Sequence, residues 1–225
     1  MSKQIGIVGW RTGDNSFGTT IPYLEFISKF GTPVILHPDT EVKDLDLLIL
    51  PGGPDIDHTR YRKDYISLYV QKPCPVREHF DKYRLSEYIK RKTPIFGICR
   101  GMQSLAVFFK ASLHQEMYHE TSDDKTRYEL VHNILITGEC QRILKLSFNK
   151  VKVNSLHHQA IIRNTLPEEL SVIAVYLGKL DNTVEAIAHT KLPIAGVQYH
   201  PEELSSDKLT ESLIIKLLET KKSIF

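Results

Sequence analysis

A cysteine between two glycines is the feature of this chain most able to do chemistry. Residues 94–103 read PIFGICRGMQ, so an apolar, β-prone stretch ends in Gly-x-Cys-x-Gly, and residues compatible with a helix follow at 103–110. The glycines permit a tight turn that a Cβ would obstruct, which predicts a strand–turn–helix elbow with Cys99 at its tip. A helix N-terminus beneath the sulfur favours the thiolate. Cys99 is therefore a candidate nucleophile. The alternative, from this segment alone, is an inert cysteine buried at the end of a core strand.

A thiol nucleophile needs a base and a group that orients the base, and a second segment supplies both residue types. Residues 196–203 read GVQYHPEE, so an apolar stretch ends at His200, and Pro201 cannot continue a strand ladder. Glu202 lies close enough in sequence to bond one ring nitrogen and leave the other facing the thiol. The alternative is an exposed histidine beside a turn.

A developing oxyanion needs backbone N–H donors, and the chain offers them at two places. One is Arg100, directly after the candidate nucleophile. The other is Gly52-Gly53, which follows the apolar stretch 45–50 and has no side chains to keep a ligand away from the backbone. We expect Gly53 and Arg100 to form the oxyanion hole. The alternative for Gly52-Gly53 is a tight turn and nothing more.

These three motifs together resemble the signatures of the class I glutamine amidotransferase-like superfamily. The matching segments are 50–53 (LPGG), 97–103 (GICRGMQ) and 196–202 (GVQYHPE). Members of that superfamily carry a Cys-His-Glu triad in this chain order, so the resemblance implies that Cys99, His200 and Glu202 form the triad.

A narrower similarity is to the γ-glutamyl hydrolase branch of that superfamily. It is carried by Arg100, by residues 51–56 followed by Tyr61, and by residues 153–160, which read VNSLHHQA. Residues 77–81 resemble the Arg-Asp-x-x-Glu element of the branch with the two acids exchanged, which leaves the local substrate contacts open.

The hydrolase resemblance implies a reaction on a small-molecule γ-glutamyl amide that uses no cofactor. Cys99 would attack the γ-carbonyl, His200 would protonate the leaving amine, and water would release glutamate from the thioester. Because the glutamyl group carries an ammonium and a carboxylate, its pocket needs polar groups. The residues expected to bind substrate are Gly52, Arg100, Gln103, Asn154, Ser155, His157 and His158, and Arg77, Glu78 and Gln159 are further candidates.

A functional and a structural interpretation compete at the polar segment 154–159. It is either part of the substrate pocket or a solvated turn between strands. His157-His158 could also suggest a metal, but no further ligands follow at a supporting spacing, so we expect no metal site.

Two other functions fit the same motifs. The first is a glutaminase subunit that docks transiently on a separate synthetase and supplies it with ammonia, although Arg100 favours the hydrolase. The second is a non-catalytic binding or regulatory protein that keeps the fold, against which the three filled triad positions argue. If the chain is an enzyme, we expect alkylation of Cys99 to abolish activity, and we expect activity to fall once His200 is protonated.

A basic and aromatic group follows residues 50–53, which we call the oxyanion loop. It forms either a rim over the leaving group or, as we favour, an ordinary solvated loop and helix. Its members are His58, Arg60, Tyr61, Arg62, Lys63, Tyr65 and Tyr69.

The candidate site needs a scaffold in which strand ends converge, and the first half of the chain predicts one. Strand patterns at 4–9, 34–36, 45–50 and 94–98 alternate with helical patterns at 21–30 and 76–91. This rhythm predicts an α/β fold with a mostly parallel, doubly wound sheet and helices on both faces. In such sheets ligands bind beyond the carboxyl ends of the strands, where Cys99 and Gly53 lie.

The second half of the chain predicts an antiparallel hairpin extension of that sheet. An amphipathic helix at 205–221 closes the chain, and we expect one class I glutamine amidotransferase-like, flavodoxin-like domain over residues 1–225. The strand patterns lie at 131–137, 142–148, 151–155, 171–176, 184–189 and 194–199.

Composition excludes several other classes. The chain has 225 residues, of which 41% are hydrophobic and 25% charged, and a net charge of +2 gives no argument for binding nucleic acid or a membrane surface. Three cysteines make no disulfide framework, the N-terminus lacks a signal-peptide core, and no apolar run is long enough to cross a bilayer. We therefore expect a cytoplasmic protein, and the sequence leaves a homodimer open.

Overall fold

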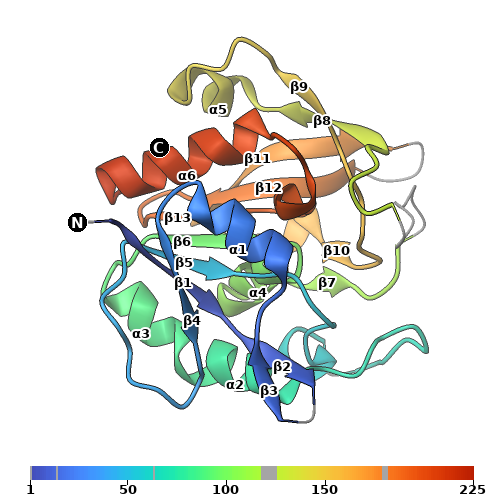
Figure 1. Ribbon diagram of the computed structural model, residues 1–225. Coiled ribbons are helices and arrows are strands. Elements are labelled where there is room, and N and C mark those ends of the chain that lie inside the picture. The colour runs from blue at the N-terminus through green and yellow to red at the C-terminus, as the bar shows by residue number, and fades with distance from the viewer. Residues whose placement is uncertain (1, 14, 63, 118–125, 179–181) are drawn as a thin grey trace.

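A single large sheet organises the computed structural model, which describes residues 2–13, 15–62, 64–117, 126–178 and 182–225 (Figure 1). Within these residues the sheet has nine strands in the order β4-β1-β5-β6-β13-β12-β11-β8-β9. The first five are mutually parallel and the last four antiparallel. The α/β prediction, with a parallel sheet and an antiparallel extension, is thus confirmed.

The parallel strands are short, and three of them are buried along their whole length, as expected for strands covered on both faces. They are β4 (Thr32–Leu36), β1 (Gln4–Val8), β5 (Leu47–Leu50), β6 (Ile95–Ile98) and β13 (Ile194–Val197). Because β5, β6 and β13 are neighbours and parallel, their carboxyl ends lie together at one edge. The segments that follow these ends carry the oxyanion loop, the candidate nucleophile and the candidate base.

The antiparallel strands extend the sheet from β13. They are β12 (Asn182–His189), β11 (Leu170–Leu177), β8 (His132–Ile136) and β9 (Lys150–Val153). Two small sheets accompany the large one: β2 (Trp10–Gly13) pairs with β3 (Ser16–Gly18), and β7 (Leu113–His114) pairs with β10 (Ala160–Ile161).

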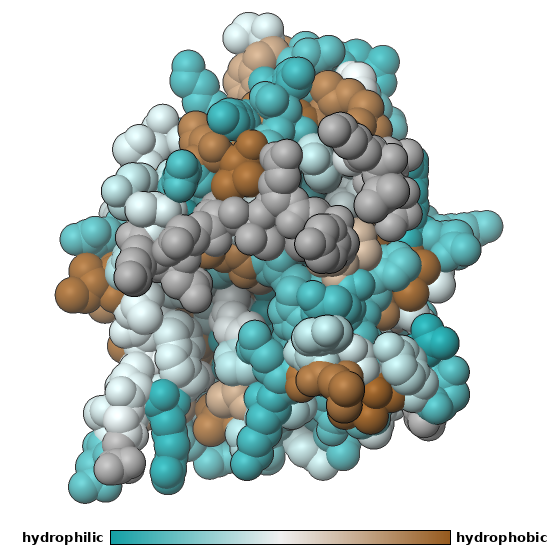
Figure 2. All heavy atoms as spheres, turned by 90° about the vertical axis from the view of Figure 1, so that its right-hand side faces the viewer, coloured by the Kyte–Doolittle hydropathy of each residue, from teal (hydrophilic) through white to brown (hydrophobic). Residues whose placement is uncertain are grey.

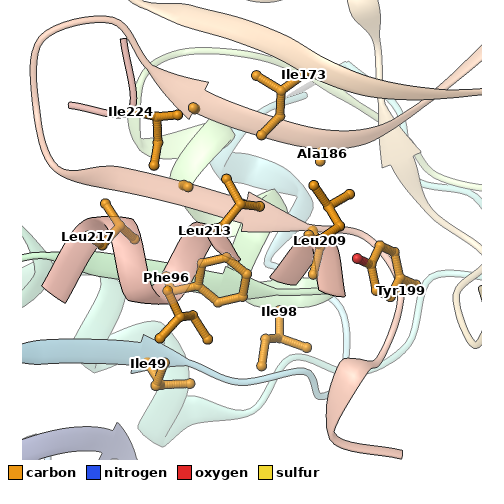
Figure 3. Packing of buried hydrophobic residues seen from close by; sticks show 14 of the residues in the cluster. Ile49, Phe96, Ile98, Ile173, Ala186, Tyr199, Leu209, Leu213, Leu217 and Ile224 are labelled. Atoms are coloured by element: carbon orange, nitrogen blue, oxygen red, sulfur yellow. The ribbon is translucent and has the colours of Figure 1, made fainter. Parts of the chain in front are cut away.

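Helices cover both faces of the sheet (Figure 1). On one face α1 (Ile21–Ser28) and α6 (Lys208–Thr220) pack on the sheet, and Figure 3 shows Leu209, Leu213 and Leu217 of α6 opposite Phe96 and Ile98 of β6. On the other face lie α2 (Pro75–Tyr83), α3 (Leu85–Lys90) and α4 (Arg100–Phe108). Short 3₁₀ turns occupy His58–Arg60, Arg163–Thr165 and Pro201–Glu203. Within the described ranges, no helix combines the length and the apolar character that a membrane span requires.

The strand expected at residues 142–148 is wrong, because helix α5 (Gly138–Ile143) occupies its start. The Thr137 side chain caps this helix by accepting a hydrogen bond from the Cys140 N–H at 3.4 Å. Cys140 is buried, and the apolar residues that follow pack against the same core. A short apolar run is compatible with both a strand and a helix, so here the cap and the packing determine that a helix forms.

Two further differences concern the N-terminal half. The single helix expected at 76–91 is two helices, α2 and α3, that meet at Arg84. The hairpin of β2 and β3 was not expected, because its side chains are mostly exposed and carry no alternating apolar pattern.

Candidate active site

The nucleophile candidate sits on a strained backbone between β6 and α4. Cys99 has φ 51° and ψ −109°, a conformation with positive φ that is rare for any residue other than glycine. Its N–H donates to the Val197 carbonyl at 2.8 Å, which fixes the elbow to β13. A Cβ on Gly97 would lie 2.6 Å from the Gly101 carbonyl carbon, and a Cβ on Gly101 would overlap the Leu50 carbonyl oxygen. Both glycines are therefore needed for the strand and the helix to approach each other this closely.

The base candidate is held by a carboxylate and by its own backbone. His200 follows β13, and its Nδ1 lies 2.6 Å from Oε1 of Glu202 in the next 3₁₀ turn. Asn154 bonds the His200 backbone twice: its Oδ1 accepts from the His200 N–H at 2.9 Å and its Nδ2 donates to the His200 carbonyl at 3.0 Å. The ring thus has one tautomer-setting partner, and its Nε2 is left for the sulfur.

The electrostatics of this histidine differ from the sequence expectation. Burial lowers the pKa of His200, but the Glu202 carboxylate and the nearby Cys99 outweigh burial and raise the pKa to about 10. His200 therefore carries its proton at neutral pH. An imidazolium beside a sulfur favours the thiolate form of that sulfur. The raised pKa of His200 thus opposes the expectation that activity falls once this histidine is protonated, because the ring is already protonated at neutral pH.

A chain of side-chain amides supports the sulfur from the other side. The Gln198 Nε2 donates to the Cys99 Sγ at 3.6 Å, and the Gln198 Oε1 accepts from the Gln103 Nε2 at 3.1 Å. The Gln103 Nε2 also donates to the Gln159 carbonyl at 3.0 Å. Gln103 was expected to bind substrate, but its amide N–H groups donate hydrogen bonds to other residues of the protein. Gln198 was not among the expected site residues. It lies two positions before His200, and both residues follow the carboxyl end of β13.

The oxyanion loop after β5 is fixed by two side chains from different helices. The Gly52 N–H donates to the Tyr23 hydroxyl of α1 at 2.8 Å, and the Arg77 guanidinium of α2 donates to the Pro51 and Gly52 carbonyls at 2.6 and 3.0 Å. Gly53 has φ +148°, and a Cβ on Gly52 would lie 2.6 Å from the His200 Cε1. The loop therefore lies directly against the base.

Tyr23 is a second site residue that the sequence analysis missed. Burial and the adjacent Glu202 carboxylate raise the pKa of its phenol well above the usual value, so it stays protonated. Since its oxygen accepts from Gly52, its proton remains to face Glu202. No local motif marks this tyrosine, because its neighbours in α1 form an ordinary amphipathic pattern.

The Arg100 side chain lies in a buried ion network on the α2 side of the elbow. Its guanidinium donates to Asp81 at 2.8 Å and to Glu78 at 2.6 Å, and Arg60 bonds the same two carboxylates at 3.2 and 2.9 Å. Burial lowers the pKa of Arg100, but the two carboxylates outweigh it and the net pKa is raised. The expected substrate contact of Arg100 thus falls to its backbone N–H. Arg60 of the expected rim is bound in this network instead.

Two further members of that basic and aromatic group contact each other. Arg62 pairs with Asp64 at 3.1 Å and lies over the Tyr65 ring at 5.3 Å, and both arginine and tyrosine are well exposed. Lys63 lies outside the described residues.

Four of the six residues in the polar segment 154–159 are buried and the other two are partly buried, so the solvated-turn interpretation is wrong. Ser155 is fully buried, and the His157 Nδ1 is 2.9 Å from the Gln159 carbonyl. His158 is bonded on both ring nitrogens, to Asp55 at 2.9 Å and to Glu116 at 2.7 Å. The bond to Asp55, opposed by burial and helped by Glu116, raises the pKa of His158 to about 9. His158 thus ties the loop after β5 to two other segments.

A pocket of about 640 Å³ opens beside these groups and is lined by Gly52, Gly53 and His200. Its wall combines the apolar and aromatic side chains Trp10, Pro22, Tyr23 and Pro54 with the cations Arg11 and Arg127. The Trp10 and Tyr23 rings meet edge to face at 6.1 Å. Figure 2 shows the face of the molecule toward which the parallel strands of Figure 1 run, where hydrophilic side chains separate the apolar groups.

Comparisons with known proteins show what this chain is similar to. The model of the peptidase C26 family matches residues 11–202. A Schizosaccharomyces pombe protein with the provisional name of a glutamine amidotransferase is 32% identical over 205 residues, which cover 85% of this chain and 77% of that protein. The carbamoyl phosphate synthase small chain of Aquifex aeolicus is 34% identical over 120 residues, 53% of this chain and 28% of that protein.

Solved structures show the same fold. The crystal structure of a glutamine amidotransferase from Thermotoga maritima superposes with a TM-score of 0.60 at 15% identity, over 96% of this chain and 83% of that one. At this identity the likeness concerns the fold alone.

Proposed function

The chain belongs to the peptidase C26 family of class I glutamine amidotransferase-like proteins, and we propose that it hydrolyses a γ-glutamyl amide bond in a small molecule through a thioester on Cys99. The observation that carries this proposal is the geometry at the carboxyl ends of β6 and β13. A cysteine on a strained elbow faces a protonated histidine whose other nitrogen is bound to a buried glutamate 2.6 Å away.

The first half of the proposed reaction transfers the glutamyl group to sulfur. The Cys99 thiolate adds to the γ-carbonyl carbon, and the carbonyl electron pair moves onto oxygen, where the N–H groups of Gly53 and Arg100 stabilise it. As the tetrahedral intermediate collapses, the C–N bond breaks and the leaving nitrogen takes the proton from His200. The amine departs and leaves a γ-glutamyl thioester beside a neutral imidazole.

The second half uses the imidazole as a base. His200 takes a proton from water while the water oxygen adds to the thioester carbon, and the new oxyanion occupies the same donors. Collapse expels the Cys99 thiolate and releases glutamate, whose new acid loses its proton to solvent. The enzyme returns to the thiolate–imidazolium pair. Glu202 supports the imidazolium in both halves.

The size of the pocket supports an amine substituent larger than ammonia. A volume of about 640 Å³ beside His200 and Gly53 exceeds what the release of ammonia requires, and its wall carries both aromatic and cationic side chains. The identity of the leaving amine is to be read from a substrate panel.

The proposal is tested by incubating the purified chain with a panel of γ-glutamyl amines and with glutamine. Glutamate and the free amine are both measured. We expect at least one γ-glutamyl amine to be hydrolysed with a higher kcat/KM than glutamine, and C99A to be inactive on it. Failure of every γ-glutamyl amide, or hydrolysis by C99A at the wild-type rate, would overturn the proposal.

A second candidate function is a glutaminase subunit that supplies ammonia to a separate synthetase. The similarity to a carbamoyl phosphate synthase small chain favours this reading over about half of the chain. The same panel separates the two functions, because a glutaminase subunit would prefer glutamine and its activity would rise when a partner is added.

A further inference from the structure

Arg77 of α2 is a buried cation with an unusual set of partners. Its side chain is almost fully buried, and its Nη1 and Nη2 donate to the carbonyls of Gly52 and Pro51 at 3.0 and 2.6 Å. Burial and the neighbouring Arg100 charge lower its pKa to about 10, so it stays charged at neutral pH. Burying a guanidinium costs free energy unless its donors are used, and here two of them are used on one loop.

These contacts fix the orientation of a specific peptide plane. Tyr23 holds the Gly52 N–H at 2.8 Å, so Arg77 and Tyr23 together bind the backbone polar groups on both sides of Gly52. In a trans peptide the C=O of one residue and the N–H of the next point in opposite directions. With the Gly52 carbonyl turned to Arg77, the Gly53 N–H must point away from Arg77, and among the described residues it is bonded to no backbone acceptor.

We propose that Arg77 is a positioning residue that orients the Gly52–Gly53 peptide, so that the oxyanion hole is formed in the free chain before substrate or a partner subunit binds. This inference rests on the proposed function, in which the Gly53 N–H stabilises the oxyanion. It assigns Arg77 to the backbone of the catalytic loop, whereas the sequence made it a candidate for direct contact with substrate.

The helix that carries Arg77 also sets the second oxyanion donor. Glu78 and Asp81 of α2 hold the Arg100 side chain at 2.6 and 2.8 Å, and Arg100 begins α4 directly after Cys99. One helix therefore bonds the Gly52 carbonyl, which shares its peptide with the Gly53 N–H, and the side chain of Arg100. Arg84, at the C-terminal end of the same helix, also donates to a backbone carbonyl, but to that of Pro38 at 2.9 Å, which makes it a matched control outside the oxyanion loop.

The test compares R77M with R84M and the wild type. Each variant is assayed with the best γ-glutamyl amine, with p-nitrophenyl acetate as an acyl donor that needs no glutamyl recognition, and with iodoacetamide. Alkylation by iodoacetamide needs the thiolate but develops no oxyanion. We expect R77M to lower kcat and the acylation rate by about 100- to 1,000-fold, with KM changed less than about 3-fold and alkylation unchanged. R84M should stay within about 3-fold of the wild type in all assays, because among the described residues Arg84 donates hydrogen bonds to neither the oxyanion loop nor Arg100.

Three outcomes would overturn the inference. R77M could acylate at the wild-type rate, it could lose alkylation together with acylation, or R84M could lose as much as R77M. Should R77M fail to fold, R77K keeps the positive charge but has a single donor nitrogen in place of the two that bond the loop. We expect R77K to lose less kcat than R77M, at an unchanged alkylation rate. A wild type that reacts with p-nitrophenyl acetate but hydrolyses no γ-glutamyl amide would instead refute the proposed function alone.

Discussion

At the scale of single residues, the Cys99 sulfur has a different partner on each side. His200 presents a protonated ring, and Gln198 presents an amide N–H at 3.6 Å. Both favour a negative sulfur, the first by charge and the second by a hydrogen bond. In the proposed reaction the sulfur is thus prepared for attack before substrate binds, and the imidazole would act first as an acid.

The pH dependence of the reaction follows from this arrangement. Because the folded-state pKa of His200 is raised to about 10, the ring keeps its proton as pH rises past 6.5, and activity should fall only as pH approaches 10. E202Q removes a carboxylate that raises this pKa, so we expect the alkaline limb of kcat/KM to move to lower pH and kcat to drop by about 10- to 100-fold.

The control for E202Q is E203Q. Glu203 is adjacent in sequence but pairs with Arg127 at 2.7 Å, so its removal should leave the alkaline limb in place. A wild-type profile that rises through pH 6.5 and stays flat beyond pH 10 would contradict the ion pair, as would equal profiles for the two variants.

At the scale of elements, the nucleophile depends on how closely β5, β6 and α4 approach one another. A Cβ at Gly101 would overlap the Leu50 backbone, which cannot move without displacing the sheet. We expect G101A to destabilise the protein by about 3 kcal/mol or more, because the overlap is with backbone and not with a flexible side chain. Urea unfolding followed by circular dichroism measures the change.

The matched variant for this prediction is G138A in the first turn of α5. No atom lies within 4 Å of a Cβ there, so we expect the free energy of unfolding to change by less than about 1 kcal/mol. Equal stability of G101A and the wild type would show that the elbow does not need the close approach.

The sequence predicts the parallel core well because each of its strands is a short apolar run that ends at a turn or a motif. The sequence predicts secondary structure less well where a short apolar run is compatible with both a strand and a helix. Residues 142–148 are apolar enough for a strand, yet the Thr137 cap and the buried Cys140 make a helix of the preceding turn. The hairpin of β2 and β3 was not predicted, because its side chains do not alternate between apolar and polar. Its Trp10 nevertheless lines the pocket.

The candidate site divides in the same way. Cys99, His200 and Glu202 are found from sequence because each lies in a motif whose chemistry is local. Tyr23 and Arg77 are not found as loop-holding residues, because their partners lie 29 and 25 or 26 positions away and only the fold brings them together. Long-range contacts to backbone atoms leave no signature in the types of the residues contacted.

At the scale of the whole molecule, His158 joins three distant segments around the site. It bonds Asp55 after β5 and Glu116 after β7. Its folded-state pKa of about 9 lies above the unfolded value of 6.5, so its contribution to stability is fully present below pH 6.5 and is lost as pH rises through 9. We expect the wild type to lose more stability than H158Q between pH 6.5 and pH 9.5.

Urea midpoints at the two pH values measure this difference, and subtracting the variant from the wild type removes contributions shared by other groups. H79Q is the control, because His79 is exposed and lies 3.6 Å from Asp39, which is more exposed still. Parallel pH profiles for the wild type and H158Q would contradict the role given to His158.

The central claim is a γ-glutamyl thioester on Cys99, and its most direct test is to trap that adduct. Wild-type protein and C99A are mixed with γ-glutamyl-p-nitroanilide, quenched in acid within the first turnover, and analysed by intact mass and peptide mapping. We predict one γ-glutamyl group on the peptide that contains Cys99 in the wild type, and none in C99A, which also releases no p-nitroaniline. Release of p-nitroaniline by C99A at the wild-type rate, or a γ-glutamyl group on any other residue, would contradict the account.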